Sequence, residues 1–166
     1  MTTTTAVHAS ATGDPAYSEV MPCEPESART ARMLVTLALS AWDLGELTDT
    51  AELIVSEFVG NAVRHTRCHH IQVTVTRLAP DLVRIAVIDR STRRPAPRTA
   101  GADDEHGRGL AVVRALAEDT GTDTLARGKR VWAQLRTPGG EPPLVSQGDL
   151  QVLPDRVSNP TRADAS

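Results

Sequence analysis

The sequence predicts a two-layer α/β sandwich, with helices on one face of a mixed, mostly antiparallel sheet. Apolar residues recur with a helical period over residues 26 to 65 and then alternate with a period of two over residues 71 to 77. A further helical pattern and two strand-like segments follow a long polar stretch. Helices packed on one face of a sheet bury both kinds of pattern, which is why we expect this fold class.

The first two elements are predicted to be helices. Residues 26 to 44 form the first, and Gly45 supplies a C-terminal end. The second covers ELIVSEFVGNAVRH, residues 52 to 65, with Asp49 as its N-cap and Glu52 completing a capping-box-like pair. The apolar residues expected to face the core are Ala31, Leu34, Val35, Ala38 and Trp42 in the first helix, and Ile54, Val55, Phe58, Val59, Ala62 and Val63 in the second.

Strands are predicted over residues 71 to 77 and 82 to 89, joined as an antiparallel hairpin by the turn LAPD. The polar stretch of residues 90 to 106 has no periodicity and is long enough to be a functional loop. A third helix is predicted to begin near Gly109. The segment GTDTLARGKRVWAQL, residues 121 to 135, is predicted to form two strands that turn at Arg127 and Gly128.

Both ends of the chain lack apolar periodicity. Residues 1 to 24 are rich in Thr, Ala, Ser and Pro, and residues 138 to 166 in Pro and Gly. We therefore expect a flexible N-terminal arm over residues 1–24, one folded domain over residues 25–137 and a flexible C-terminal tail over residues 138–166.

Composition excludes several classes of function. Aromatic residues make up 2% of the chain and the net charge is −3, so neither base stacking nor a phosphate-backbone footprint is supported, and we expect no direct contact with nucleic acid. No apolar run is long enough for a membrane span, and the first residues do not form a signal peptide. Two cysteines are too few for a disulfide scaffold. A cytoplasmic protein without membrane contact is expected.

Four features carry the chemistry. Glu57, Asn61 and His65 follow one another at i, i+4 spacing along a polar edge of the second helix. Asp89 ends a buried strand, the long loop follows it, and GRGL, residues 107 to 110, opens a helix. Each has an ordinary interpretation by itself: a solvated helix border, a turn-capping carboxylate, a loop-to-helix junction. The free N–H groups of a helix N-terminus nevertheless suit a phosphate, and glycine lets a ligand approach closely.

Taken together, these residues resemble the GHKL family of ATP-binding domains, the histidine kinase- and Hsp90-like proteins with the Bergerat-type fold. SEFVGNAVRH is similar to the family's N-box, VIDRS to the aspartate of its first glycine box, GRGLAVV to its second glycine box and GKRVWAQL to its closing strand. The resemblance covers residues 28 to 135. The subgroup it most resembles is that of the small anti-sigma-factor serine kinases.

The resemblance implies ATP and Mg²⁺ as cofactors and assigns roles to three residues. Asn61 would offer its amide oxygen to Mg²⁺, which keeps few protein ligands. Glu57 would accept the proton of a water or of a serine hydroxyl that attacks the γ-phosphate. Asp89 would accept a hydrogen bond from the adenine amino group. His65 is interpreted as a structural end of the N-box helix.

The second glycine box would close over the phosphates. Gly107, Gly109 and Leu110 belong to the helix start that approaches them, and Arg108 would reach the γ-phosphate unless it is simply exposed. The loop from Arg90 to His106 would be the ATP lid.

The chain also departs from the family pattern. No glycine follows Asp89 before Gly101, and Lys129 and Arg130 stand where the closing strand often carries a small hydroxyl residue. Gly60 lies inside the second helix at a cost of about 1 kcal/mol relative to Ala.

Three functions remain open at this point. The first is an ATP-dependent protein serine/threonine kinase that phosphorylates an antagonist protein and binds a sigma factor, and so regulates transcription. The second is a nucleotide-gated protein-binding module without kinase activity, in which Glu57 is dispensable. The third is a metal site in HTRCHH, residues 65 to 70, whose His and Cys side chains are zinc ligands. The sequence leaves open whether the chain forms a homodimer.

Overall fold

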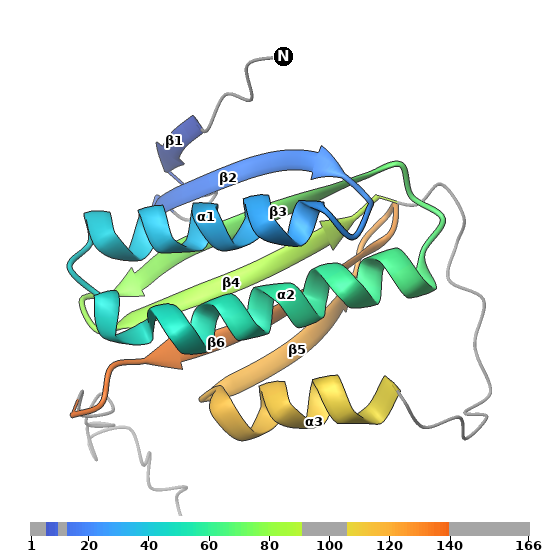
Figure 1. Cartoon of the computed structure of the whole chain (residues 1–166). Coiled ribbons are helices and arrows are strands. Elements are labelled where there is room, and N and C mark those ends of the chain that lie inside the picture. The colour runs from blue at the N-terminus through green and yellow to red at the C-terminus, as the bar shows by residue number, and fades with distance from the viewer. Residues whose placement is uncertain (1–5, 10–12, 91–105, 140–166) are drawn as a thin grey trace, which may run out of the picture.

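The computed structural model describes residues 6–9, 13–90 and 106–139 (Figure 1). Six strands form one sheet in the order β1-β2-β3-β4-β6-β5, and every neighbouring pair of these strands is antiparallel. The helices are α1 (Ser27–Ala41), η1 (Gly45–Leu47), α2 (Thr48–His65) and α3 (His106–Leu116). The strands are β1 (Ala6–Ala9), β2 (Pro15–Pro22), β3 (His70–Ala79), β4 (Leu82–Asp89), β5 (Asp119–Thr124) and β6 (Lys129–Arg136).

The predicted two-layer sandwich is confirmed. α1, α2 and α3 lie on the same side of the sheet, with α2 across its middle strands (Figure 1). One face of β3 and β4 is buried beneath the helices, while β3 places Gln72 and Thr74 on the other face. The fully buried side chains that join the two layers include Ile71, Val73, Val75, Val83 and Ile85 from the sheet and Val35, Leu39, Ile54, Val55 and Val59 from the helices.

The start of the second helix differs from the prediction. Asp49 is not the N-cap: α2 begins at Thr48, Leu47 holds the cap position, and no side chain caps the helix. The reason is the 3₁₀ turn η1, which continues directly into α2 and leaves no break at Asp49. Glu52 instead accepts a hydrogen bond from Thr36 Oγ1 at 2.6 Å and thereby links α2 to α1.

The prediction of an unstructured arm over residues 1 to 24 is wrong for the part that the structure describes. β2 pairs with β3 along its whole length, and β1 pairs with β2. Polar residues are buried in β2: Ser18 is bonded to Thr74 Oγ1 at 3.0 Å and accepts from Gln72 Nε2 at 2.9 Å, and Glu19 is 7% exposed. Buried polar residues remove the apolar alternation by which such a strand is recognised.

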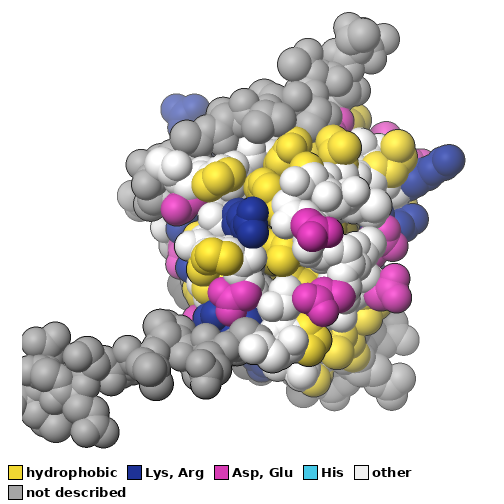
Figure 2. All heavy atoms as spheres, turned by 90° about the vertical axis from the view of Figure 1, so that its left-hand side faces the viewer, with side chains coloured by type: hydrophobic (Ala, Val, Ile, Leu, Met, Phe, Trp, Pro, Cys, Tyr) yellow, Lys and Arg dark blue, Asp and Glu magenta, His cyan; other side chains and the backbone are white. Residues whose placement is uncertain are grey.

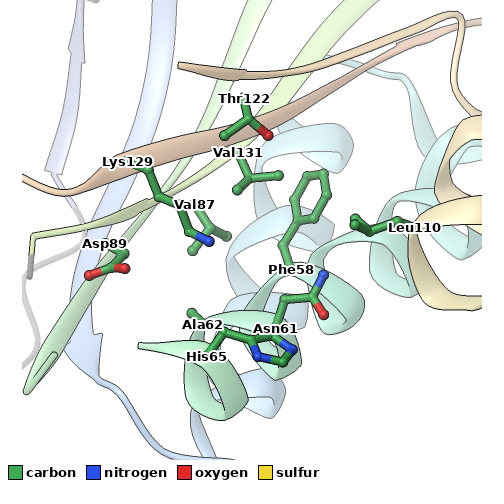
Figure 3. Close-up of a pocket in the computed structure, with 10 residues that line it drawn as sticks. All are labelled: Phe58, Asn61, Ala62, His65, Val87, Asp89, Leu110, Thr122, Lys129 and Val131. Carbon is green, nitrogen blue, oxygen red and sulfur yellow. The ribbon is translucent and has the colours of Figure 1, made fainter. Parts of the chain in front are cut away.

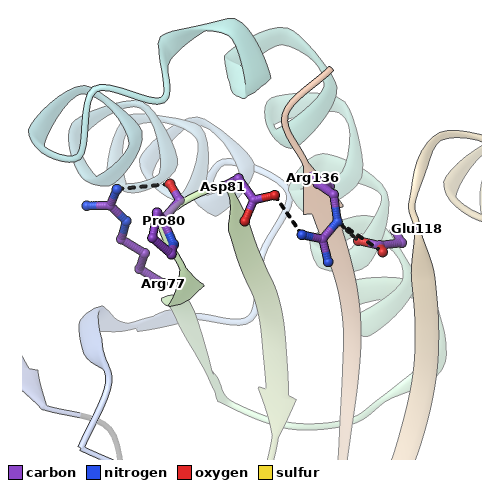
Figure 4. Close-up of polar contacts among 5 residues, drawn as sticks. All are labelled: Arg77, Pro80, Asp81, Glu118 and Arg136. Atoms are coloured by element: carbon purple, nitrogen blue, oxygen red, sulfur yellow. Dashed lines mark hydrogen bonds and ion pairs between the residues drawn. The ribbon is translucent and has the colours of Figure 1, made fainter. Parts of the chain in front are cut away.

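The remaining strands agree with the prediction. β3 and β4 form a hairpin that turns at Pro80 and Asp81, and β5 and β6 form a second hairpin that turns through residues 125–128. Arg136 joins the two hairpins, because its guanidinium pairs with Asp81 at 2.6 Å and with Glu118 at 3.0 Å (Figure 4). The tail predicted beyond Pro138 lies almost wholly outside the described residues.

The surface carries several separate apolar side chains. Met33 and Leu37 are 63% and 51% exposed on the outer side of α1. On the face at the α1–α2 connection, hydrophobic side chains are scattered among acidic and basic ones (Figure 2). None of the described helices is long and apolar enough to cross a membrane.

Candidate functional site

A cavity of about 230 Å³ opens between α2, the first turns of α3 and the strands β4, β5 and β6 (Figure 3). Its lining combines an apolar wall with a few polar side chains, as small-molecule sites do. The lining residues are Phe58, Asn61, Ala62, His65, Val87, Asp89, Leu110, Thr122, Lys129 and Val131.

The apolar wall comes from both layers of the sandwich. Phe58 projects from α2 into the space between the layers, opposite Val131 of β6, and Leu110 of α3 lies at the far end (Figure 3). An apolar wall of this kind suits a flat, apolar ring system in a small-molecule ligand. The same apolar face of α2 that builds the core therefore also builds one side of the cavity.

Asp89 supplies the carboxylate of the cavity. It is the last residue of β4 and points to the helix side, following Val83, Ile85 and Val87 in the strand alternation, and it is 3% exposed. Its partner across the strand pair is Lys129, which also lines the cavity. A buried carboxylate at one end of an apolar slot is suited to accept a hydrogen bond from an amino group.

Asn61 and His65 reach the cavity from one edge of α2, as their i, i+4 spacing predicts. Arg64 Nη2 donates to Asn61 Oδ1 at 3.4 Å, which is long for a hydrogen bond. The amide oxygen can therefore exchange this weak bond for a ligand at little cost. The interpretation of His65 as the end of the N-box helix is confirmed, since α2 ends there. Its ring also lines the cavity.

Glu57 lies one turn before Asn61 but faces α3 and is not among the residues that line the cavity. Its carboxylate occupies the space in which a Cβ on Gly109 would lie, with Glu57 Cδ 3.0 Å from that position. Because α3 begins at His106, this contact falls in the first turn of the helix, where the helix dipole favours a negative charge.

The second glycine box is helical rather than a loop. Gly107 and Arg108 belong to α3, which begins three residues earlier than predicted, and the structure does not describe the side chain of Arg108. Leu110 lines the cavity. The predicted ATP lid lies outside the described residues except for Arg90 and His106 at its two ends.

The closing strand resolves one departure from the family pattern. Of its two basic residues only Lys129 faces the cavity, whereas Arg130 lies on the other face of the sheet and pairs with Asp123 at 2.6 Å. A hydroxyl also lines the cavity from the neighbouring strand β5, where Thr122 lies opposite Val131. Nothing in the sequence signalled this position, because it depends on the register of the β5–β6 hairpin.

Residues 21–135 match the family model of the histidine kinase-like ATPase domain, which is more than half of the chain. The chain belongs to the histidine kinase-like ATPase family. As an ATPase domain of this family it binds ATP, and the resemblance to GHKL proteins is confirmed at the level of the family. No curated protein matches the chain.

The zinc alternative gains no support from this ATPase domain. Among the residues that the structure describes, no group of three or more His, Cys, Asp or Glu side chains is placed to hold a metal ion. His65 turns toward the cavity, while Cys68 lies in the connection between α2 and β3.

Proposed function

We propose that the chain is an ATP-dependent protein serine kinase of the anti-sigma-factor type, which transfers the γ-phosphate of ATP to a serine of an antagonist protein and binds a sigma factor. The observation that carries the proposal is the position of Glu57. A carboxylate is held one helical turn before Asn61, against the N-terminal turn of α3, between the two elements that the family uses around the phosphates.

The cavity residues account for nucleotide binding. Asp89 accepts a hydrogen bond from the exocyclic amino group of adenine, and Phe58 and Val131 contact the two faces of the ring. Thr122 and Lys129 lie beside the same slot and offer a donor to a ring nitrogen. In this orientation the phosphates extend along α2 toward Asn61 and the beginning of α3, whose free N–H groups favour negative charge.

Asn61 fits Mg²⁺ as an oxygen ligand. The amide oxygen lies at the cavity wall, and only the long bond from Arg64 has to open before it can coordinate. A magnesium ion bound there would neutralise charge on the phosphates of ATP. Arg64 is then released beside the phosphates, where a guanidinium is favourable.

Glu57 acts as the general base in the proposed transfer. It accepts the proton of the serine hydroxyl as the hydroxyl oxygen attacks the γ-phosphate, and ADP leaves. Because the carboxylate contacts Gly109, a small movement of α3 sets its distance from the phosphates. The docking surface for the partner proteins is assigned to the outer side of α1, where Met33 and Leu37 are exposed.

A nucleotide-gated binding module is the second candidate, and one observation favours it. Glu57 faces α3 rather than the cavity. Its carboxylate therefore also fits a structural role, in which its contact with Gly109 links α3 to α2. In that case ATP changes only the affinity for a partner.

The first experiment is calorimetric titration of ATP with and without Mg²⁺. Asp89→Asn should weaken binding about 10- to 100-fold, since a hydrogen bond to a charged group contributes about 1.5–3 kcal/mol. Asn61→Ala should remove the dependence on Mg²⁺ and leave magnesium-free binding nearly unchanged. Unaltered binding in Asp89→Asn would refute the assignment of this cavity to adenine.

The second experiment separates the two candidates. Glu57→Gln keeps the size of the side chain and removes the base, so a kinase retains ATP binding and loses transfer of labelled γ-phosphate to an antagonist protein. Glu52→Gln, which makes the same chemical change in α2 and alters only the contact with Thr36, is the matched control and should retain transfer. Equal partner binding and nucleotide dependence in wild type and Glu57→Gln, with no transfer by either, would establish the binding module.

A further inference from the structure

The two cysteines of the chain lie together although 44 residues separate them in the sequence. Cys23 directly follows β2, and Cys68 lies in the connection between α2 and β3. Both are partly buried against the core. The proximity follows from the pairing of β2 with β3, which the sequence alone did not predict.

The hydroxyl of Thr66 lies between the two sulfur atoms. Thr66 Oγ1 is 2.8 Å from Cys68 Sγ and 3.8 Å from Cys23 Sγ. The same hydroxyl donates its single proton to the carbonyl of Ala62 at 2.7 Å, so toward the sulfur atoms it can only accept. Both thiols therefore point their hydrogen atoms at one oxygen, which brings the two sulfur atoms to the same small site.

The backbone holds the two segments at the spacing of a sheet. Cys23 N–H donates to the carbonyl of His69 at 2.9 Å and extends the β2–β3 ladder by one residue beyond the pair Pro22 and His70. Residues opposite each other in such a ladder have Cα atoms about 4.5–5.5 Å apart, and disulfides span about 4.4–6.8 Å. Cys68 directly precedes His69 in the chain, so a disulfide to Cys23 requires no large movement of the backbone.

The thiol of Cys68 is not a nucleophile by itself at neutral pH. Burial raises its pKa to about 12, with a further contribution from the nearby carboxylate of Asp89. The first attack on an oxidant is therefore assigned to Cys23, and Cys68, whose sulfur lies at the same Thr66 hydroxyl, is placed to complete the reaction.

We propose that Cys23 and Cys68 form a reversible intramolecular disulfide when the protein meets a peroxide. The Cys23 sulfur attacks hydrogen peroxide, the O–O bond breaks, and a sulfenic acid and one water are formed. The Cys68 sulfur then attacks the sulfenic acid, an S–S bond replaces the S–O bond, and the departing hydroxide takes the proton of the Cys68 thiol and leaves as a second water. Hydrogen peroxide is reduced by two electrons and the two thiols are oxidised by two.

The site lies next to the nucleotide cavity but does not depend on the proposed kinase activity. Cys68 follows the cavity residue His65 by three positions, so the disulfide would tie the connection after α2 to the end of β2. Closing a loop of this length stabilises a domain enough to raise its Tm by about 10 °C. Thiol reductants would reverse the rise.

The test uses the reduced full-length protein, hydrogen peroxide and measurement of free thiols under denaturing conditions. Wild type should lose both thiols and yield one crosslinked peptide pair containing Cys23 and Cys68, with Tm raised by about 10 °C. Dithiothreitol should restore both thiols and the original Tm. The single variants Cys23→Ser and Cys68→Ser should show neither the crosslinked pair nor the rise in Tm.

Three results would overturn the proposal. Both thiols could survive an excess of peroxide, or Cys23 could proceed to the sulfinic acid with Cys68 still reduced. Crosslinks could also form only between molecules, in proportion to protein concentration. The wild-type measurement decides between these results even if one of the serine variants does not fold.

Discussion

The substitution Gly109→Ala tests the contact between α3 and Glu57. A methyl group at this position would overlap the Glu57 carboxylate, whose Cδ lies 3.0 Å from the Cβ position with one oxygen closer still. Overpacking of this kind costs about 1–3 kcal/mol, and the better helix propensity of alanine returns up to about 1 kcal/mol. We therefore expect the free energy of unfolding to fall by up to about 2 kcal/mol.

Gly60→Ala is the matched control, because it places the same methyl group inside α2. There the added Cβ would meet only the guanidinium of Arg64, at 3.4 Å, and the side chain of Arg64 is exposed and able to move. With no overlap to offset it, the helix propensity of alanine should stabilise the protein by about 0.5–1 kcal/mol. The same chemical change is thus expected to act in opposite directions in the two helices.

Urea denaturation of the two glycine variants, of Glu57→Ala and of Glu57→Ala combined with Gly109→Ala measures these effects. In the double variant the carboxylate is gone, so the methyl group at position 109 should no longer be unfavourable, and the coupling should be about 1–2 kcal/mol. A Gly109→Ala protein as stable as Gly60→Ala, or a double variant without coupling, would show that Glu57 does not occupy this space.

Two further predictions concern the sheet. The hydrogen bond from Arg136 holds the pKa of Asp81 below 3.8, so its stabilising effect is present at neutral pH and is lost as the pH falls through that lowered pKa. Arg136→Gln should therefore lower the urea midpoint at pH 7 and have progressively less effect as the pH falls through that lowered pKa; a loss that does not change with pH would rule out the ion pair as the cause. Gly121→Ala should destabilise the protein by about 1–3 kcal/mol and alter its tryptophan fluorescence, since a Cβ there would lie 2.6 Å from Trp132 Cε2, the ring on which Arg84 stacks at 4.5 Å. An unchanged emission spectrum and urea midpoint would contradict the close contact.

The elements that were predicted correctly are those whose apolar pattern coincides with one buried face. α2 has six buried residues at helical spacing, and five of them are among those expected to face the core. β4 has the predicted bounds, because its apolar run is bounded by a turn and by Asp89. β2 was missed since burial of Ser18 and Glu19 depends on partners in a strand more than 50 residues away. The prediction of Asp49 as the N-cap was wrong because the 3₁₀ turn η1 continues directly into α2, which begins at Thr48.

The candidate site was predictable in part for the same reason. Asn61 and Asp89 follow from local periodicity, which places one on the polar edge of a helix and the other on the inner face of a strand. Thr122 and Lys129 depend on the register of β5 and β6 against β4. The contact of Glu57 with Gly109 depends on how α3 packs against α2, which no spacing in the sequence encodes.

The place of β6 in the sheet has a consequence for synthesis of the protein. This strand is the last of the described strands along the chain, yet it lies between β4 and β5 and provides Lys129 and Val131 to the cavity. Until it emerges from the ribosome, β4 has no partner on that side and the cavity has no wall opposite Phe58. ATP therefore cannot stabilise a nascent chain that ends before β6, and a nucleotide can assist folding only after release of nearly the whole domain.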